Sequence, residues 1–275
     1  IDPDAFRALI DQQFDNGIKG IVPCGTTGES STLSTEEHHL VIEMAVKQTK
    51  KRGLVIAGTG SNSTREAIDL TQAAEKAGAD AALLVTPYYN KPSQEGLYQH
   101  YKTIALSTDL PLMLYSIPGR CHIQIDVETC VRLAAECPNI RAIKEAGGVT
   151  ERVRQLRAAL PADFEILSGD DALTVDFMKE GAVGIVSVAG NLIPRQMADL
   201  ATAMLEKRIG DAEAIHAQYA PLFNAFLKLD TNPVPIKAAL GLVGSCKPKL
   251  RLPMVEMPAA KVEELRGLLT TLGLL

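Results

Sequence analysis

Short apolar segments alternate with helix-like segments along most of the chain, and this alternation constrains the fold more than any other feature of the sequence. Segments such as Ala81–Val85 and Ala182–Val188 are apolar almost throughout, as expected of strands buried on both faces of a parallel sheet. We predict strands at Lys19–Gly25, Leu54–Gly60, Ala81–Pro87, Pro111–Pro118, Ile140–Ala146, Phe164–Gly169 and Ala182–Ala189. Such strands, alternating with helices over roughly 200 residues, predict an α/β fold of the (β/α)8 TIM-barrel class rather than an open sheet. No Gly-x-Gly-x-x-Gly fingerprint follows the first of these strands, which argues against a dinucleotide-binding fold.

Helix signals separate the strands and continue beyond the last one. Asp2 and Pro3 begin the first helix, and the pairs Ser34–Glu37 and Ser63–Glu66 have the spacing of a capping box. We predict helices at residues 1–16, 34–51, 63–77, 93–107, 126–136, 150–160, 171–180 and 194–207, and then at 211–229, 235–242 and 258–272.

The helices at the end of the chain have no strands between them, so the domain organisation can be predicted. We expect a barrel of residues 1–207 followed by a C-terminal helical extension of residues 208–275. The predicted strands are one too few for an eight-stranded barrel, and the chain opens with a helix. We therefore expect the first barrel strand to be missing from this chain.

Charge and cysteine content exclude several classes of function. The net charge of -5 offers no basic surplus to neutralise phosphates, so we do not expect a nucleic-acid-binding protein. No apolar run approaches the roughly 20 residues that span a bilayer, so we expect no membrane partner. The five cysteines are odd in number and contain no Cys-x-x-Cys pair, which favours reduced thiols in the cytoplasm over disulfides or a zinc site. Histidines are scattered as well, so we predict no metal centre.

One charged side chain stands out within the predicted strand Ile140–Ala146, and that is Lys144. Burial in a strand removes hydration from the ammonium group and favours the neutral amine, which attacks carbonyl groups to form Schiff bases. The alternatives are a lysine that extends to the surface or one that pairs with Glu145. Taken alone, the residue does not decide between these interpretations.

Other polar residues follow the predicted strands, at the end where a barrel builds its active site. The segment Gly25–Glu29 offers backbone N–H groups and two hydroxyls to a carboxylate, although a turn before a helix would look the same. Tyr115 is either a core tyrosine or a proton carrier. Arg120 is either a surface residue or a bidentate carboxylate anchor. We expect Asp170 and Asp171 to cap the next helix and assign them no catalytic role.

Several motifs together give the chain a family resemblance that covers nearly its whole length. They are Gly-Thr-Thr-Gly-Glu, Ala-Gly-Thr-Gly, Val-Thr-Pro-Tyr-Tyr-Asn-Lys-Pro-Ser-Gln-Glu-Gly-Leu, Tyr-Ser-Ile-Pro-Gly-Arg, Ile-Lys-Glu-Ala and Leu-Ser-Gly-Asp-Asp. In these the chain resembles the pyruvate-dependent class I aldolases of the dihydrodipicolinate synthase and N-acetylneuraminate lyase group. The resemblance implies an eight-fold barrel with a C-terminal helical extension, and a strand ahead of the helix that opens this chain. The missing strand is therefore interpreted as a truncated start.

The resemblance also implies a reaction. Synthases of this group carry Pro-x-Arg after the tyrosine-bearing strand, where the lyases lack the arginine, and Pro118–Arg120 fits the synthases. The implied reaction is the condensation of pyruvate with L-aspartate-4-semialdehyde, toward diaminopimelate and lysine, without a metal or an organic cofactor. The resemblance implies that Lys144 forms the Schiff base and that Tyr115 transfers protons with Thr26 and with Tyr89 of a neighbouring subunit. It implies that Thr27 binds the carboxylate of pyruvate and that Arg120 binds the carboxylate of the semialdehyde. The carbonyl of Val186 would line the site.

Regulation and assembly are implied in the same way. Some members are inhibited by lysine at a subunit interface, and the matching residues here are Ser30, His38, Asn62, Glu66 and Tyr88. Thr35 stands where many sensitive members have histidine, and Ser116 and Cys121 replace a common asparagine and threonine. The group forms homotetramers built as dimers of dimers. Two other functions stay open: a pyruvate aldolase that cleaves sialic or deoxy-sugar acids, and a catalytically silent barrel that binds a keto acid or serves as a scaffold.

Overall fold

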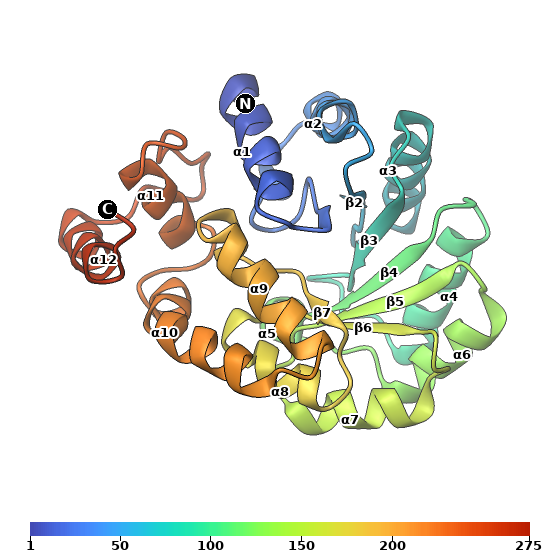
Figure 1. Cartoon of the computed structure of the whole chain (residues 1–275). Helices are drawn as coiled ribbons and strands as arrows, with labels where there is room; N and C mark the ends of the chain where they lie inside the picture. Colours follow the sequence, from blue (N-terminus) through green and yellow to red (C-terminus); the bar gives the residue numbers. More distant parts are fainter.

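The computed structural model describes residues 1–275 and contains a seven-stranded, curled parallel sheet with helices outside it (Figure 1). Each strand pairs with the next one along the chain, and no pairing joins the last strand to the first. The strands are β1 Gly20–Ile21, β2 Leu54–Gly58, β3 Ala81–Val85, β4 Leu112–Ser116, β5 Ile140–Glu145, β6 Glu165–Ser168 and β7 Gly184–Ile185. The predicted TIM-barrel-like α/β fold is confirmed. Its two edge strands are much shorter than the sequence predicts, because each lacks a partner on one side.

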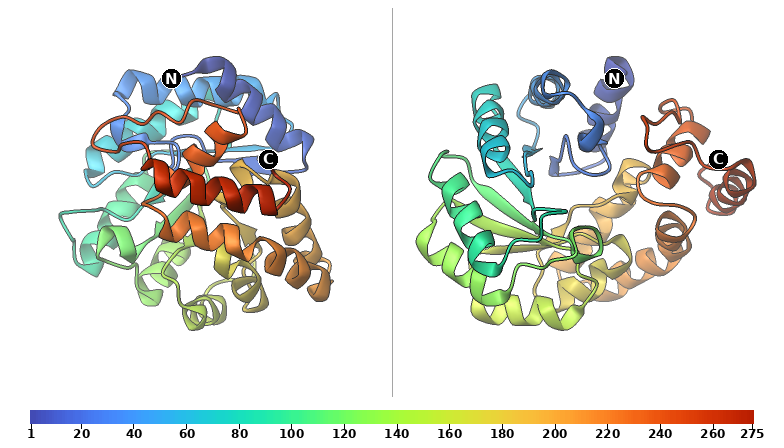
Figure 2. Two further views of the ribbon diagram at one scale, coloured as in Figure 1. Left: turned by 90° about the vertical axis from the view of Figure 1, so that its left-hand side faces the viewer. Right: turned by 180° about the vertical axis from the view of Figure 1, so that it is seen from behind.

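Helices make up the rest of the regular secondary structure. The α-helices are α1 Pro3–Asp15, α2 Thr35–Thr49, α3 Thr64–Ala77, α4 Gln94–Ala105, α5 Pro118–Cys121, α6 Val127–Glu136, α7 Thr150–Ala159, α8 Thr174–Lys179, α9 Pro194–Leu205, α10 Ile209–Lys228, α11 Val234–Leu242 and α12 Ala259–Thr271. Short 3-10 helices are η1 Ser30–Thr32, η2 Asp171–Leu173 and η3 Ala189–Asn191. The predicted C-terminal helices are confirmed as α10, α11 and α12, which lie together on one side of the molecule (Figure 2). No helix is long and apolar enough to cross a membrane.

The helix starts follow the predicted capping chemistry with two exceptions, one at α3 and one after β6. The Asp2 side chain accepts a hydrogen bond from the Ala5 N–H, and the Ser34 capping box is complete. At α3 the Ser63 hydroxyl accepts from Glu66 N–H, but the Glu66 carboxylate accepts from the Ser61 hydroxyl instead of the Ser63 N–H. The predicted second capping box is therefore only half formed.

The other exception lies after β6. Asp170 caps the next helix as predicted, by accepting from the Ala172 N–H, but the Asp171 carboxylate accepts from Ser187, Val188 and Ala189 after β7 instead.

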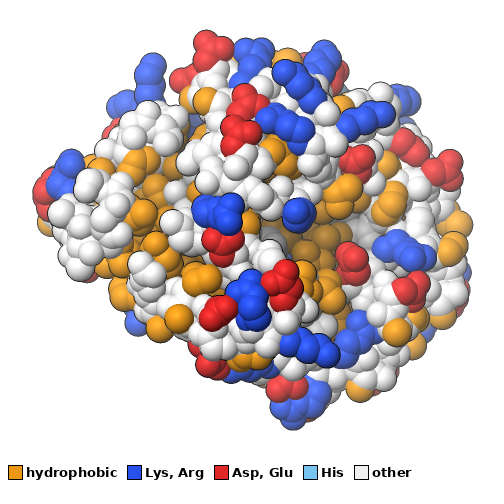
Figure 3. Space-filling view, in the orientation of Figure 1, with side chains coloured by type: hydrophobic (Ala, Val, Ile, Leu, Met, Phe, Trp, Pro, Cys, Tyr) orange, Lys and Arg blue, Asp and Glu red, His pale blue; other side chains and the backbone are white.

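The core has an outer and an inner part. Alternate strand residues such as Leu84, Leu114 and Ile143 point outward and are buried under the helices. The residues between them, Leu83, Met113, Tyr115 and Ala142, form a smaller cluster inside the curl of the sheet. One face of the molecule is hollowed, and hydrophobic side chains line the hollow (Figure 3). A separate apolar cluster joins α9 to the C-terminal helices. The boundary at residue 207 between a barrel and an extension stays a prediction.

Candidate active site

Lys144 lies on the inner face of β5, beside Tyr115 of β4 and Leu167 of β6 in the strand register. Its Nζ atom is 4.2 Å from the centroid of the Tyr115 ring. Burial lowers the pKa of Lys144 to about 8, the Asp171 carboxylate raises this pKa, and Arg120 lowers it. At pH 7 about a tenth of the amine is therefore neutral, far more than for an ordinary lysine, and the neutral form is the carbonyl nucleophile.

The neighbouring Glu145 points the opposite way and has its own partner. Its carboxylate accepts hydrogen bonds from Arg152 Nε at 2.8 Å and from the Gly147 N–H at 2.7 Å, and both charged side chains are buried. A strand alternates its side chains between two faces, so this pair lies outside the sheet while Lys144 lies inside. The alternative in which Lys144 pairs with Glu145 is wrong.

Close approach of the chain around Lys144 depends on Gly169, which follows β6. A Cβ atom at this position would lie 2.9 Å from Lys144 Cε and 2.8 Å from Ala146 Cβ. Both distances are shorter than a carbon–carbon contact allows. The glycine in the Leu-Ser-Gly-Asp-Asp motif thus leaves room for the lysine stem.

Tyr115 is buried, and burial raises its pKa to about 12. Arg120 and a hydrogen bond with Thr26 lower this pKa. The phenol therefore keeps its proton at neutral pH and can donate it to a neighbouring oxygen. Val186, just after β7, packs against the same inner cluster and donates its N–H to the Ser168 carbonyl at 2.9 Å.

Thr27 and Arg120 are held by a residue that the sequence analysis missed. Asn232, in the turn before α11, donates its Nδ2–H to Thr27 Oγ1 at 3.0 Å. Its backbone carbonyl accepts a hydrogen bond from Arg120 Nη2 at 2.8 Å. Asn232 thus brings together the two predicted carboxylate anchors, although it lies about 200 residues from Thr27. The only sequence signal was a polar Thr-Asn-Pro turn between two apolar helices.

The loop that carries Thr26 and Thr27 is fixed by further residues near the end of the chain. Lys237 forms an ion pair with Glu29, whose backbone is left-handed with φ 55°. Arg251 donates from its backbone N–H to Glu29 and forms a bidentate pair with Glu37 at 2.5 and 2.6 Å. The loop is therefore positioned from outside as well as by its own turn.

Tyr89 is not brought to the site within this chain. Its side chain is 91% exposed, and its backbone has a φ of 74°. Tyr88 beside it is also exposed. A tyrosine side chain this exposed to solvent is typical of a residue that contacts another chain.

The five predicted regulatory residues fall into two environments. Asn62 donates to the Tyr88 carbonyl at 3.1 Å, and Glu66 lies close by, bonded to Ser61. His38 is buried, bonded through Nε2 to the Gly58 carbonyl at 2.7 Å, and burial lowers its pKa. Ser30 lies in η1 at the loop that carries Thr27.

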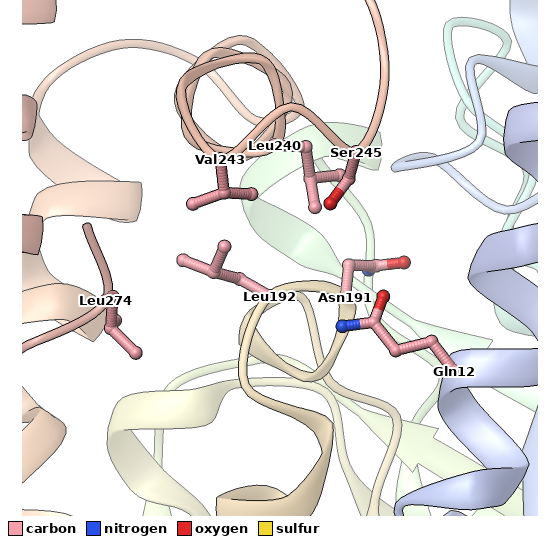
Figure 4. A pocket seen from close by; sticks show the side chains of 7 residues that line it. All are labelled: Gln12, Asn191, Leu192, Leu240, Val243, Ser245 and Leu274. Atoms are coloured by element: carbon pink, nitrogen blue, oxygen red, sulfur yellow. The ribbon is translucent and has the colours of Figure 1, made fainter.

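Two further features lie apart from these residues. A cavity of about 260 Å³ lies between α1, η3 and the C-terminal helices, and none of the predicted site residues lines it (Figure 4). No group of three or more His, Cys, Asp or Glu side chains is placed to hold a metal ion, and all five cysteines are unpaired.

Comparison with known proteins shows the family of the chain. A curated relative from Thermodesulfovibrio yellowstonii, named 4-hydroxy-tetrahydrodipicolinate synthase, is 49% identical over 275 residues, which is 100% of this chain and 94% of the relative. The chloride-inhibited dihydrodipicolinate synthase from Acinetobacter baumannii, solved in complex with pyruvate, is 44% identical with a TM-score of 0.97, covering 100% of this chain and 94% of that one. The enzyme from Cyanidioschyzon merolae, solved with lysine bound, is 40% identical with a TM-score of 0.96, covering 100% and 93%. A sequence model of the dihydrodipicolinate synthetase family matches residues 1–272, and the chain belongs to this family.

Proposed function

We propose that the protein is a 4-hydroxy-tetrahydrodipicolinate synthase, a lyase that condenses pyruvate with L-aspartate-4-semialdehyde in the biosynthesis of diaminopimelate and lysine. The observation that carries the proposal is a lysine of lowered pKa on the inner face of the sheet, next to a buried phenol. Relatives that carry this enzyme's name support it over the whole chain.

Schiff-base formation is the first step. The neutral Lys144 amine attacks C2 of pyruvate, and the carbinolamine loses its oxygen as water to give an iminium ion. This loss needs a proton donor, and Tyr115, which keeps its proton at neutral pH, is placed to supply it. The phenolate then takes a proton from C3, either directly or through Thr26, to give the enamine.

Bond formation follows from the enamine. Its C3 carbon attacks the aldehyde carbon of the semialdehyde, and the aldehyde oxygen takes up a proton. The free amino group of the semialdehyde part then attacks the iminium carbon, closes the six-membered ring and displaces the Lys144 amine, so that one water is released overall. We propose that neither a metal nor an organic cofactor is needed, because the iminium accepts the electron pair that is left at C3 when its proton departs.

Two groups anchor the two carboxylates. Asn232 donates to the Thr27 oxygen, so the Thr27 proton is free to bond a carboxylate oxygen. We assign it to the carboxylate of pyruvate. Arg120 keeps further guanidinium N–H groups beyond the one bonded to Asn232, and we assign these to the carboxylate of the semialdehyde. The Val186 carbonyl would line the pyruvate side of the site.

We further propose that Tyr89 completes the proton relay in a neighbouring subunit, within a homotetramer built as a dimer of dimers, in the cytoplasm. The exposure of Tyr89 supports this role. Lysine is proposed as a feedback inhibitor, bound near Asn62, Glu66 and Tyr88, because a related enzyme was solved with lysine bound. These side chains can supply carboxylate, amide and hydroxyl partners to an amino acid.

A second candidate function is a pyruvate aldolase that acts on a sugar acid through the same lysine. Arg120 argues against it, because a polyhydroxylated substrate calls for hydroxyl partners rather than a second guanidinium. A silent barrel is disfavoured because it would have no need of an amine with a lowered pKa.

Borohydride trapping tests the proposal. Reduction in the presence of pyruvate should add one pyruvyl group to the peptide that contains Lys144, and the variant Lys144→Arg should give none. Lys47→Arg, which changes an exposed helix lysine, is the matched control. In a separate assay without borohydride, turnover with pyruvate should favour aspartate semialdehyde over N-acetylmannosamine. Absence of an adduct would exclude the Schiff-base mechanism, and preference for the sugar would select the second candidate.

A further inference from the structure

Thr86 is a buried polar residue that the reaction as described leaves without a role. It directly follows Val85 of β3, which pairs with Tyr115 of β4 in the strand register, and its side chain is 0% exposed. Its N–H and its hydroxyl both donate to the backbone carbonyl of Tyr115, at 2.9 and 2.7 Å. Pro87 comes next and has no N–H to donate, so these are the last hydrogen bonds from this end of β3 to β4.

The backbone carbonyl of Thr86 contacts a second part of the site. It accepts a hydrogen bond from the Cys121 thiol at 3.1 Å. Cys121 is the last residue of the short helix α5, and its side chain is buried, whereas the preceding Arg120 is exposed and donates to the Asn232 carbonyl. Thr86 therefore contacts both the backbone of the proposed proton donor and the helix that carries the proposed carboxylate anchor.

The hydroxyl of Thr86 does more than satisfy itself inside the core. A buried threonine can bond a carbonyl of its own helix, as Thr71 does when it donates to Ala67 one turn earlier, at 2.6 Å. Thr86 instead bonds a residue 29 positions away, on another strand. The Tyr115 carbonyl then has both lone pairs occupied, so the backbone of β4 is held there by a second bond in addition to the strand pairing.

We propose that Thr86 is a positioning residue for both halves of the reaction: its hydroxyl fixes the backbone at Tyr115, and its carbonyl fixes, through the Cys121 thiol, the helix that carries Arg120. The inference rests on the proposed function. Proton transfer needs its two heavy atoms within about 3 Å of each other, so a shift of β4 changes the rate of the steps that use Tyr115. A carboxylate bound by two guanidinium N–H groups needs that group in a fixed place, so a shift of α5 changes the binding of the semialdehyde.

The variant Thr86→Val tests the hydroxyl without changing the shape of the side chain. Valine is also branched at Cβ and keeps the backbone N–H and carbonyl, so only the Oγ1 bond is lost. Thr86→Ser keeps a hydroxyl at the same place. Thr71→Val is the matched control, because it removes an equally buried hydroxyl from α3, outside the sheet. All variants are compared with the unsubstituted protein for the rate of pyruvate-dependent borohydride trapping, for steady-state kinetics and for thermal unfolding.

The trapping rate and kcat should fall about tenfold in Thr86→Val, because dehydration of the carbinolamine needs the Tyr115 proton, while the KM for the semialdehyde changes by less than about twofold. Thr86→Ser should recover most of the lost rate. Thr71→Val should lower the melting temperature and leave both rates unchanged. An unchanged trapping rate in Thr86→Val, or an equal loss in Thr71→Val, would overturn the inference.

The variant Cys121→Ala tests the second contact, and it decides the inference if Thr86→Val does not fold. It removes the thiol that bonds the Thr86 carbonyl and leaves the bonds to Tyr115 in place. The KM for the semialdehyde should rise several-fold, while the pyruvate-trapping rate changes by less than about twofold. Cys130→Ala, which changes an equally buried cysteine of α6, is the control and should alter neither quantity. An unchanged KM in Cys121→Ala would overturn the inference, whereas absence of adduct in the unsubstituted protein would overturn the proposed function itself.

Discussion

Gly169 leaves room for the side chain of Lys144, so the substitution Gly169→Ala tests directly whether the reaction needs this space. The added Cβ would lie 2.9 Å from Lys144 Cε, 2.8 Å from Ala146 Cβ and 3.2 Å from the Glu145 carbonyl oxygen. Its three contacts therefore all belong to β5 and the residue after it. The Lys144 stem can rotate away, but Ala146 Cβ moves only if the backbone moves.

The size of the effect follows from these distances. Carbon atoms need about 3.5 Å, so the lysine stem and the end of β5 must each shift by roughly 0.6 Å or more. Overpacking of this kind costs about 2 kcal/mol, which lowers the melting temperature by about 5 °C in a chain of this size. Displacement of the nucleophile has a much larger effect on the reaction rate. A shift of the Lys144 amine approaching 1 Å is expected to reduce kcat/KM by about 100-fold.

Trapping rates with pyruvate, steady-state turnover and thermal unfolding together measure both effects. Gly267→Ala is the control, because a Cβ there meets nothing within 4 Å and the residue lies in the middle of α12. Alanine in a helix interior should leave activity unchanged and raise stability by up to about 1 kcal/mol. A Gly169→Ala enzyme that traps pyruvate at the normal rate would refute the view that this glycine positions Lys144.

Three further predictions follow from the same geometry. The rate of pyruvate trapping should rise with pH to a midpoint near 8 and fall about tenfold for each unit below it, because only the neutral Lys144 amine reacts; a midpoint near 10.5 would contradict the effect of burial. Asn232→Ala should reduce kcat/KM by about 10- to 100-fold, because Thr27 loses its hydrogen-bond donor and the backbone that holds Arg120 is no longer fixed. The control Asn224→Ala changes an exposed residue of α10 and should leave kcat/KM unchanged. Steady-state kinetics with each substrate varied in turn will measure both. Arg152→Leu should lower the free energy of unfolding by about 3–5 kcal/mol, because it leaves the buried Glu145 carboxylate without its partner, and denaturant titration measures this loss. An effect below 1 kcal/mol would show that water reaches that carboxylate.

The sequence predicts those parts of the molecule that depend on neighbours in the chain. The apolar strands and the capping at Ser34 are local, and both are confirmed. Lys144 stood out because a charged residue in an apolar strand violates a local rule. The sequence leaves three interpretations of its environment open. The ion pair between Arg152 and Glu145 excludes one of them, the pairing of Lys144 with Glu145.

Contacts over long sequence separation could not be predicted in this way. Asn232 contacts Thr27 over a sequence separation of 205 residues, and nothing in its own turn encodes that contact. Asp171 resembles a helix cap in sequence, and only the position of β7 shows that it accepts from Ser187 instead. The length of β1 and β7 depends on strand pairing at the sheet edges, which is also a tertiary property.

The nucleophile must be neutral before it attacks, which calls for burial without an acidic partner, and the alternation of β5 meets this requirement. Glu145 is the nearest carboxylate in sequence, and a side chain on the same face would have held Lys144 protonated. Because it lies on the opposite face, bound to Arg152, no adjacent carboxylate holds the Lys144 amine in its protonated form. The alternation of the strand thus keeps the close carboxylate away from the nucleophile, and a carboxylate beside Lys144 on the inner face would remove the neutral amine that the reaction needs.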